Sequence, residues 1–399
     1  MRHLLKSFRA HPLPLASRAD SGGDATKTLD AILRAAIRDG ASDVHFEPKE
    51  SGLLVRFRLD GEMRDHTNVP LAQRDALLAR GKIFGGMDIT EKRLPQDGRA
   101  VLSDGGRRFH LRLSTLPTVY GENLVVRLLD QSMPAQSLAD LGFTTRQAAA
   151  FDGALNGPAG LVLLTGPTGS GKTTTLHSAL HALDYRGRVI HTLEDPVEYE
   201  FPAIRQTEIR ERIGLTFAAS LRALLRQNPD VMLVGETRDG ETAQLAIRGA
   251  LTGHLILSTL HTNDALEAVP RLRDLGVPSF LIAASLRLLA AQRLVRRICP
   301  ECRVPHPEGE RLRLLHAQPE GRFYRPVGCA ACHGRGFRGR LAIFEIIPTQ
   351  NLLPLIAADA PLAELTALRE REGHQTLWDH GVGAAAAGLT TVEEVARVL

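Results

Sequence analysis

The chain has no long hydrophobic run, few aromatic residues and few lysines. None of its 399 residues lies in an apolar stretch of the roughly 18 residues that a membrane-spanning helix needs. Residues 1–17 are basic but contain no apolar core of roughly 7–15 residues, so no secretory signal is expected. The net charge of +4 is too small for this length to indicate bulk nucleic-acid binding, and aromatic residues make up only 5%. We therefore expect a cytoplasmic protein that reaches any membrane through partners.

Cysteine is also scarce, and its placement is informative. The chain has four cysteines in one short segment, and they form two C-x-x-C motifs separated by 26 residues: Cys299, Cys302, Cys329 and Cys332. Without export, disulfides are not expected, and this spacing is typical of a closed four-thiolate zinc site with a structural role. A redox-active pair is the alternative interpretation, but redox chemistry has less need of two matched motifs.

The first third of the chain indicates a small α+β domain. Residues 1–25 contain proline and glycine and are interpreted as a loose tail, and residues 26–131 as the domain itself. Apolar residues recur at helical spacing over 28–39, and Gly40 follows where a helix often ends. Residues 43–48 and 53–63 alternate as strands do, and Asp60-Gly61 favours a tight hairpin. Residues 132–139 are interpreted as a linker.

The remaining residues, 140–399, indicate an α/β domain. Short apolar runs alternate with helical patterns, at 160–165, 188–193, 230–235 and 254–260. Continuous apolar strands separated by helices predict a parallel sheet that is covered on both faces. Within this domain we expect a cysteine module at 296–337 and a mostly helical C-terminal part at 341–399.

A phosphate-binding loop follows the first of these runs. The residues fit G-x-x-x-x-G-K-[ST] and stand between a predicted strand and a predicted helix, the context that the motif requires. Glycines allow backbone N–H groups to surround phosphate oxygens. Lys172 would reach the β- and γ-phosphates, and the Thr173 hydroxyl would bind Mg²⁺. The candidate nucleotide-binding residues here are Gly166, Pro167, Thr168, Gly169, Ser170, Gly171, Lys172, Thr173 and Thr174.

Acidic residues follow two further predicted strands. Glu194-Asp195 follows the run at 188–193, and Glu236 follows the run at 230–235. Ligands of open parallel sheets bind at the carboxyl ends of the strands, and phosphoryl transfer needs carboxylates to orient water and metal. His254 and His261 flank the run at 254–260, where one could contact a γ-phosphate or serve a structural role.

These motifs together resemble a known family. GPTGSGKTTT, TLEDPVEYE, LRQNPDVMLVGETRD and GHLILSTLHTNDA resemble the Walker A, Asp, Walker B and His boxes of secretion and type IV pilus ATPases. ASDVHFEP, VRFRLDGEM and LPQDGR resemble the preceding domain of that family. The resemblance extends from about residue 28 to the C-terminus, and the tetracysteine module is typical of the GspE/PilB branch.

The resemblance implies a RecA-like, hexameric, Mg²⁺-dependent ATPase that binds ATP, Mg²⁺ and Zn²⁺. It makes Glu236 the general base and gives Glu194 a part in positioning Mg²⁺ and the attacking water. His254 and His261 would be the His-box pair. Four arginines would bridge domains and subunits around the nucleotide: Arg99, Arg112, Arg222 and Arg226.

The partners implied are an inner-membrane platform protein of a secretion or pilus machine and, as a further candidate, a membrane recruiting protein. Because only about 25 residues precede the matching region, we expect a short form that lacks the extra N-terminal docking domain. Direct binding to nucleic acid is not expected. The alternatives are a DNA-translocating or conjugative motor with the same core, and a zinc-ribbon module that senses nucleotide without hydrolysing it.

Overall fold

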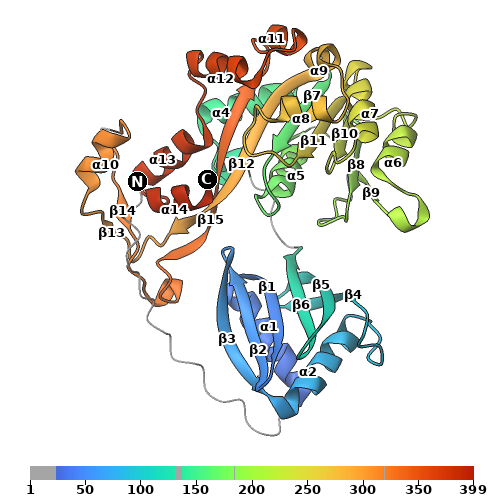
Figure 1. Cartoon of the computed structure of the whole chain (residues 1–399), viewed down its shortest axis with the longest axis vertical. Coiled ribbons are helices and arrows are strands. Elements are labelled where there is room, and N and C mark those ends of the chain that lie inside the picture. Colours follow the sequence, from blue (N-terminus) through green and yellow to red (C-terminus); the bar gives the residue numbers. More distant parts are fainter. Residues whose placement is uncertain (1–23, 132–136, 184, 319) are drawn as a thin grey trace. The chain divides into compact units, whose positions relative to one another are not determined.

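The computed structural model describes residues 24–131, 137–183, 185–318 and 320–399, so residues 1–23 of the predicted tail at 1–25 and most of the predicted linker lie outside it. The chain divides into two compact units between residues 133 and 134, and each is described here by itself (Figure 1). Within the described residues, no helix combines the length and the apolar character needed to cross a bilayer.

Unit 1 is a six-stranded antiparallel sheet with two helices. The strand order is β3-β2-β1-β6-β5-β4. The elements are α1 (Ala25–Asp39), β1 (Ala41–Lys49), β2 (Gly52–Leu59), β3 (Glu62–Pro70), α2 (Leu71–Phe84), β4 (Gln96–Asp104), β5 (Arg107–Thr118) and β6 (Gly121–Asp130). The predicted helix and its glycine end are confirmed, because Gly40 adopts a φ of 73° after α1. The predicted hairpin is confirmed too, with Asp60 and Gly61 at positive φ between β2 and β3.

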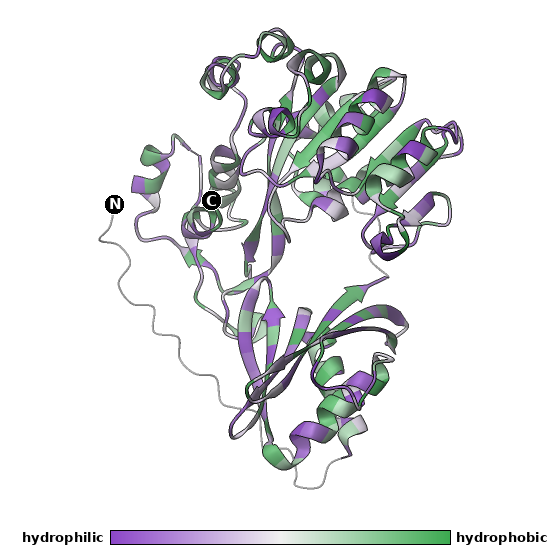
Figure 2. Ribbon diagram, turned by 45° about the vertical axis from the view of Figure 1, so that its right-hand side comes forward, coloured by the Kyte–Doolittle hydropathy of each residue, from purple (hydrophilic) through white to green (hydrophobic). Residues whose placement is uncertain are grey.

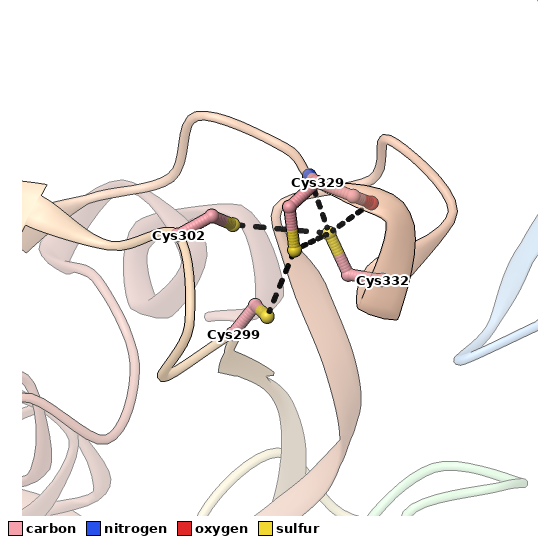
Figure 3. A group of neighbouring side chains, drawn as sticks. All are labelled: Cys299, Cys302, Cys329 and Cys332. Carbon is pink, nitrogen blue, oxygen red and sulfur yellow. Dashed lines mark hydrogen bonds between the residues drawn. The ribbon is translucent and has the colours of Figure 1, made fainter.

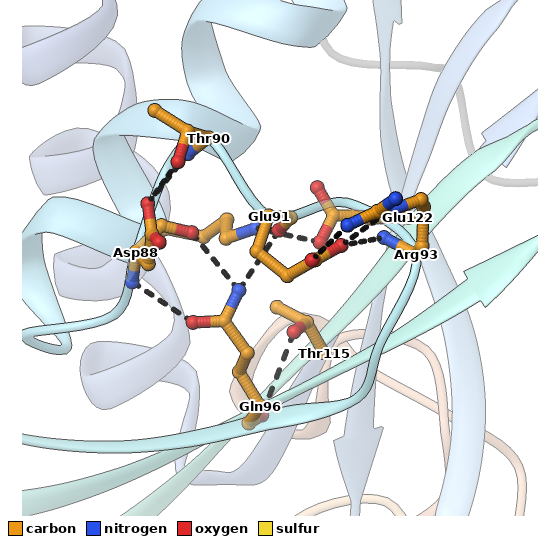
Figure 4. Close-up of polar contacts among 8 residues, drawn as sticks. Asp88, Thr90, Glu91, Arg93, Gln96, Thr115 and Glu122 are labelled. Carbon is orange, nitrogen blue, oxygen red and sulfur yellow. Dashed lines mark hydrogen bonds and ion pairs between the residues drawn. The ribbon is translucent and has the colours of Figure 1, made fainter.

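A buried ion pair holds unit 1 together between α2 and β6, and Figure 4 shows the neighbouring polar contacts of Glu91 and Gln96. Lys82 of α2 is 1% exposed, and its Nζ donates to Glu122 Oε1 at 2.7 Å and to the Glu91 carbonyl at 2.6 Å. The Gln96 side chain donates to the carbonyls of Asp88 and Glu91, both at 2.9 Å, and accepts from the Asp88 N–H. These contacts fix the segment between α2 and β4.

Unit 2 is built on a seven-stranded sheet with the order β15-β12-β7-β11-β10-β8-β9. All neighbours are parallel except β15, which pairs antiparallel with β12. The strands are β7 (Gly160–Thr165), β8 (Ile190–Glu194), β9 (Arg205–Glu208), β10 (Val231–Val234), β11 (Leu255–Leu260), β12 (Leu286–Ile298) and β15 (Phe337–Pro348). The predicted parallel sheet is therefore confirmed, with β9, β12 and β15 in addition to the four strands that the sequence indicated.

Helices cover both faces of this sheet, whose central strands are hydrophobic along their length (Figure 2). On one face, Leu176 and Leu180 pack with Ile190 of β8 and Leu233 of β10. On the other face, Leu221 and residues at 243–250 pack with Leu193, Met232 and Val234. The helices are α3 (Leu138–Leu141), α4 (Thr145–Leu155), α5 (Lys172–Ala182), η1 (Glu211–Ile213), α6 (Phe217–Leu224), α7 (Gly240–Leu251), α8 (Ala268–Asp274) and α9 (Ser279–Ser285).

The cysteine module lies between the ends of β12 and β15. It contains β13 (Val304–Pro305), α10 (Gly309–Leu315), β14 (Tyr324–Arg325) and η2 (Ala330–Cys332). The C-terminal helices are α11 (Leu353–Ala357), α12 (Leu362–Arg371), α13 (Leu377–Ala386) and α14 (Val392–Val398). Residues 341–348, which the sequence analysis placed in a mostly helical part, belong to β15 because they pair with β12 at the edge of the sheet.

Candidate nucleotide site and metal centre

The loop between β7 and α5 has the backbone that a phosphate cradle needs. Gly166, Gly169 and Gly171 have φ values of 148°, 80° and 88°, in the region that favours glycine. A Cβ at Gly166 would lie 2.6 Å from the Gln292 carbonyl oxygen and 2.7 Å from Ser170 Oγ, so no larger residue fits there. The loop ends at the N-terminus of α5, where backbone N–H groups and the helix dipole favour an anion.

Lys172 is the first residue of α5, and its side chain contacts the phosphate loop. Its Nζ donates to the carbonyls of Gly166 at 2.7 Å and Pro167 at 3.1 Å. Burial lowers the pKa of Lys172 to about 8, and the nearby Glu236 carboxylate partly opposes that shift. The structure thus brings the loop lysine and Glu236 close enough to interact electrostatically.

Glu236 follows β10, and its carboxylate lies between the guanidinium of Arg238 and the imidazole of His261. Its Oε1 is 2.5 Å from Arg238 Nη2, and its Oε2 is 3.5 Å from His261 Nε2. Arg238 Nη1 also lies 4.0 Å from Asp195 Oδ2, and the hydrogen bond to Glu236 raises the pKa of Arg238. Glu236, Arg238, His261 and Asp195 therefore form one polar group at the carboxyl ends of three strands.

Glu194 is not part of that group. Its side chain is buried and accepts from Thr192 Oγ1 at 2.6 Å and from Gln206 Nε2 at 3.0 Å, and it lies 3.0 Å from His177 Nε2. Burial by itself raises the pKa of the Glu194 carboxyl, but the hydrogen bonds, that of His177 first, outweigh burial and lower the pKa. The carboxylate is therefore held ionised inside the protein.

The two histidines of the predicted pair lie at opposite ends of β11. His261 follows the strand and faces Glu236, whereas His254 precedes it and lies 2.9 Å from the Gly249 carbonyl at the end of α7. Six strand residues separate them by roughly 20 Å. The structure therefore does not bring His254 to the group around Glu236.

The four predicted arginines lie in two places. Arg99 on β4 and Arg112 on β5 face each other across paired strands of unit 1. Arg222 and Arg226 stand at the end of α6 in unit 2, where Arg222 pairs with Glu241 and Arg226 donates to the Arg222 carbonyl at 2.9 Å.

The structure adds residues that the sequence analysis did not select. Arg238 and Asp195 stood inside the quoted motifs but were given no role, and His177 lies in the helix that follows the loop. Arg293 of β12 is 7% exposed, donates to the Asn263 carbonyl at 2.8 Å, and has its pKa lowered by burial. No motif marked Arg293, because the sequence analysis did not identify β12. A cavity of about 620 Å³ borders the loop and is lined by Pro167, Thr168 and His261 among others.

The four cysteines converge on one point (Figure 3). All four sulfur atoms lie within 4.8 Å of one another, and adjacent sulfurs are 3.7–3.9 Å apart. A disulfide needs about 2.05 Å, whereas four thiolates around zinc, each about 2.3 Å from the metal, lie about 3.8 Å apart. Burial raises the pKa of Cys332, but the N–H groups of Cys329 and Gly336 outweigh it and lower the pKa to about 7. The donor set therefore fits a tetrahedral metal ion.

A parallel α/β sheet with a phosphate loop at a strand–helix junction, and with carboxylates at the ends of neighbouring strands, defines a P-loop nucleotide-binding protein. Residues 18–397 match the model of a protein family that is described as "Type II/IV secretion system protein". The chain belongs to this family. The family, the α/β fold and the tetracysteine cluster that the sequence predicted are thus confirmed.

Two relatives illustrate the similarity in sequence. The chain is 45% identical to the type II secretion system protein E of Klebsiella pneumoniae, over 95% of this chain and 77% of the relative. It is 46% identical to the type IV pilus assembly ATPase PilB of Myxococcus xanthus, over 95% of this chain and 68% of the relative.

Two solved structures show the same fold. The ATPase DotB of Legionella pneumophila superposes with a TM-score of 0.72 at 21% identity, over 95% of this chain and 97% of that chain. The pilus retraction motor PilT with bound ADP gives a TM-score of 0.61 at 25% identity, over 92% and 96% of the two chains.

Proposed function

We propose that this chain is a cytoplasmic ATPase that drives assembly of a type II secretion pseudopilus or a type IV pilus. The observation that carries the proposal is the phosphate loop with Lys172 beside Glu236, in a chain that belongs to the secretion and pilus ATPase family. Motion between the two units would transmit the energy of hydrolysis to an inner-membrane platform protein. The chain would act as a homo-hexamer, in line with the hexameric assembly that the sequence resemblance implies.

Each residue of the loop has a task that its chemistry allows. The backbone N–H groups of the loop surround the phosphates, and Pro167, which has no N–H, fixes the backbone between them. The donors are Gly166, Thr168, Gly169, Ser170, Gly171 and Thr174. Lys172 exchanges its loop carbonyls for the β- and γ-phosphate oxygens. Thr173, in the first turn of α5, supplies a hydroxyl ligand for Mg²⁺. The ion, when bound, neutralises charge on the phosphates.

Glu236 is the general base in this proposal. It is partly buried and lies close enough to Lys172 to affect the pKa of that lysine, so it can orient water and accept its proton. His261 contacts its second oxygen and keeps it in place. Glu194 accepts its hydrogen bonds inside the protein, so its part in positioning Mg²⁺ and water is indirect and acts through the end of β8.

The remaining roles are proposed from the family. Arg99, Arg112, Arg222 and Arg226 complete the charge stabilisation of the transition state from the first unit or a neighbouring subunit, because guanidinium supplies a fixed charge and a fork for phosphate oxygens. His254 holds the opposite end of β11. Cys299, Cys302, Cys329 and Cys332 would hold a structural Zn²⁺, whose closed coordination leaves no position for catalysis. A membrane recruiting protein is a further candidate partner.

The experiment is a steady-state ATPase assay combined with light scattering, with and without single-stranded and duplex DNA. Lys172→Ala should abolish nucleotide binding or turnover. Glu236→Gln should keep nucleotide binding and lose roughly 100-fold or more in rate, as expected for a lost general base. Glu200→Gln, an exposed acid in the loop after β8, is the matched control and should behave as the parent. Normal turnover in Lys172→Ala would refute the site, and strong stimulation by DNA would favour a DNA translocase instead.

A further inference from the structure

Residues 261–267, the His261 loop, connect β11 to α8 and carry one contact of the site. The loop begins with His261, whose Nε2 lies 3.5 Å from Glu236 Oε2. It also contacts the strand that leads into the phosphate loop, since Thr165 Oγ1 donates to the Asp264 carbonyl at 3.1 Å. The place of His261 therefore depends on the groups that hold the rest of the His261 loop.

Arg293 of β12 contacts both the His261 loop and the phosphate loop. Its Nη2 donates to the Asn263 carbonyl at 2.8 Å, and its Nη1 donates to the Gln292 carbonyl at 3.1 Å. A Cβ at Gly166 would lie 3.2 Å from Arg293 Nη1, so the guanidinium lies beside the first glycine of the phosphate loop. Burial, and after it the charge of Arg293, lowers the pKa of Lys172. The Arg293 cation is thus felt at the phosphate site.

Glu345 of β15 contacts the buried part of the His261 loop. Its side chain is 1% exposed, and its Oε2 accepts from the Ala265 N–H at 3.4 Å. Its Oε1 accepts from Arg369 Nη1 of α12 at 2.9 Å. Burial raises the pKa of the Glu345 carboxyl, and Arg369 opposes that shift. The negative charge of Glu345 therefore depends on a side chain of the C-terminal helices.

The register of β12 with β15 puts both charged side chains on the same face of the sheet. Ala291 pairs with Glu345, and Arg293 pairs with Ile343. Side chains two residues apart on a strand share a face, as do those of directly opposed residues. Ala291 and Ile343 belong to the same hydrophobic cluster as Ala265 of the His261 loop. Arg293 and Glu345 therefore lie on the face against which this loop packs.

The contacts of these buried charges indicate positioning of the loop. Apolar residues of similar size are often as stable as a buried ion pair, so burial of charge is weak evidence for a role in stability. Here the charged groups reach the backbone of one short segment. Arg293 reaches the Asn263 carbonyl, and Glu345 reaches the N–H of Ala265, two residues further on.

We propose that Arg293 and Glu345 are positioning residues that hold the His261 loop against the phosphate loop and so keep His261 in contact with Glu236. Arg369 keeps Glu345 charged, and the position of the loop therefore depends on helix α12. The inference rests on the proposed function and deepens it, because it adds residues from β12, β15 and α12 to the site of hydrolysis.

The first test compares Arg369→Met with the double variant Glu345→Leu, Arg369→Leu in thermal midpoint, kcat and KM. Arg369→Met leaves a buried carboxyl without its cation but keeps an acceptor for the Ala265 N–H. It should lower the thermal midpoint and keep kcat per folded molecule within a few-fold. The double variant should recover most of the thermal midpoint. It should nevertheless lose roughly 10-fold in kcat at a similar KM, because the loop is misplaced.

Asp359→Asn is the matched control for this comparison. Asp359 is an exposed acid just before α12 that pairs with Arg273 of α8 and does not touch the His261 loop. The variant should behave as the parent in thermal midpoint and kcat. If kcat simply follows the thermal midpoint across the three variants, so that the double variant is as active as the parent, the positioning role of Glu345 is overturned.

The second test addresses Arg293 through the pH dependence of binding of a fluorescent ADP analogue. In the parent, affinity should weaken past about pH 8, where Lys172 loses its proton. Arg293→Met removes one cause of the low pKa of Lys172, so this weakening should move to higher pH, and kcat should fall roughly 10-fold. Arg293→Lys keeps a cation and a donor for the Asn263 carbonyl and should resemble the parent. Parental kcat and pH profile in Arg293→Met, or equal damage in Arg293→Lys, would overturn the role of Arg293.

Hydrogen exchange separates this inference from the proposed function, because it needs no hydrolysis. Amides of residues 261–267 should exchange faster in the double variant than in Arg369→Met or Asp359→Asn. If the unmodified chain binds nucleotide without hydrolysing ATP, the proposed function fails, while hydrogen exchange and the pH profile still decide the positioning role. If the parent hydrolyses ATP and the double variant keeps parental kcat and exchange, the positioning role fails and the proposed function stands.

Discussion

The buried ion pair of unit 1 should tolerate the loss of both partners better than the loss of one. Lys82 and Glu122 have side chains that are 2% and 8% exposed, and their charged atoms are 2.7 Å apart. Lys82→Met removes the cation and leaves the Glu122 carboxylate without its ion-pair partner in a buried position. The Glu91 carbonyl keeps a donor, because Gln96 Nε2 also reaches it at 2.9 Å. The cost therefore comes chiefly from Glu122.

Its magnitude follows from the burial. Removing one partner of a buried pair costs about 3–5 kcal/mol, whereas replacing both by apolar groups of similar size is often nearly neutral. Lys82→Met should therefore lower the free energy of unfolding of unit 1 by about 3–5 kcal/mol, and Lys82→Met with Glu122→Leu should recover most of that loss. Arg64→Gln breaks a more exposed pair with Glu62 in the same sheet and should cost about 0–1 kcal/mol.

Hydrogen exchange of the full chain, followed by mass spectrometry, measures this effect in unit 1 itself. Amides of α2 and β6 that exchange through opening of the unit should lose roughly 100-fold or more in protection in Lys82→Met, and only a few-fold in Arg64→Gln. The double variant should lie close to the parent. Protection in Lys82→Met that matches Arg64→Gln, or a double variant as damaged as the single one, would refute the reasoning.

Three further predictions concern unit 2. Cys302→Ser should reduce bound zinc below one equivalent by metal analysis of protein purified without chelator and increase hydrogen exchange over residues 296–337; full zinc retention would contradict the four-thiolate site. Because burial lowers the pKa of Lys172 to about 8, nucleotide affinity should weaken as pH rises past about 8, and Lys172→Arg should flatten that profile. His380 accepts the Phe344 N–H at Nδ1, and burial lowers the pKa of His380. Its unfolded form binds a proton more readily, so the free energy of unfolding by urea should fall as pH drops below about 6.5, and less so in His380→Asn.

Local patterns in the sequence were enough to find the elements and the loop. The apolar positions of α1 repeat at helical spacing and end at Gly40, and the four apolar runs became β7, β8, β10 and β11. The phosphate loop is readable because its glycines, its lysine and its position between a strand and a helix are local properties of the chain. The cysteine spacing predicted a cluster for the same reason.

The strands that pair over long distances were harder to predict. β12 carries charged and polar residues between apolar ones, and β15 follows a loop-rich module, so neither shows the continuous apolar run of a buried strand. Their pairing joins residues 286–298 with residues 337–348. Because of this pairing, residues 341–348 form a strand, although the sequence analysis placed them in a mostly helical part. Arg293 lies beside the phosphate loop because β12 also pairs with β7, the strand that precedes the loop.

The sequence by itself determined the chemistry that is available: a phosphate loop, two acidic strand ends and four thiols. Only the tertiary structure decided which acid faces which side. Glu194 and Asp195 are adjacent in the chain, but strand alternation and the register of β8 with β10 send Glu194 to His177 and Asp195 toward Glu236. Which face of the sheet a side chain lies on, and what it contacts there, depends on the pairing of its strand with distant segments. A motif within one stretch of the chain does not contain that information.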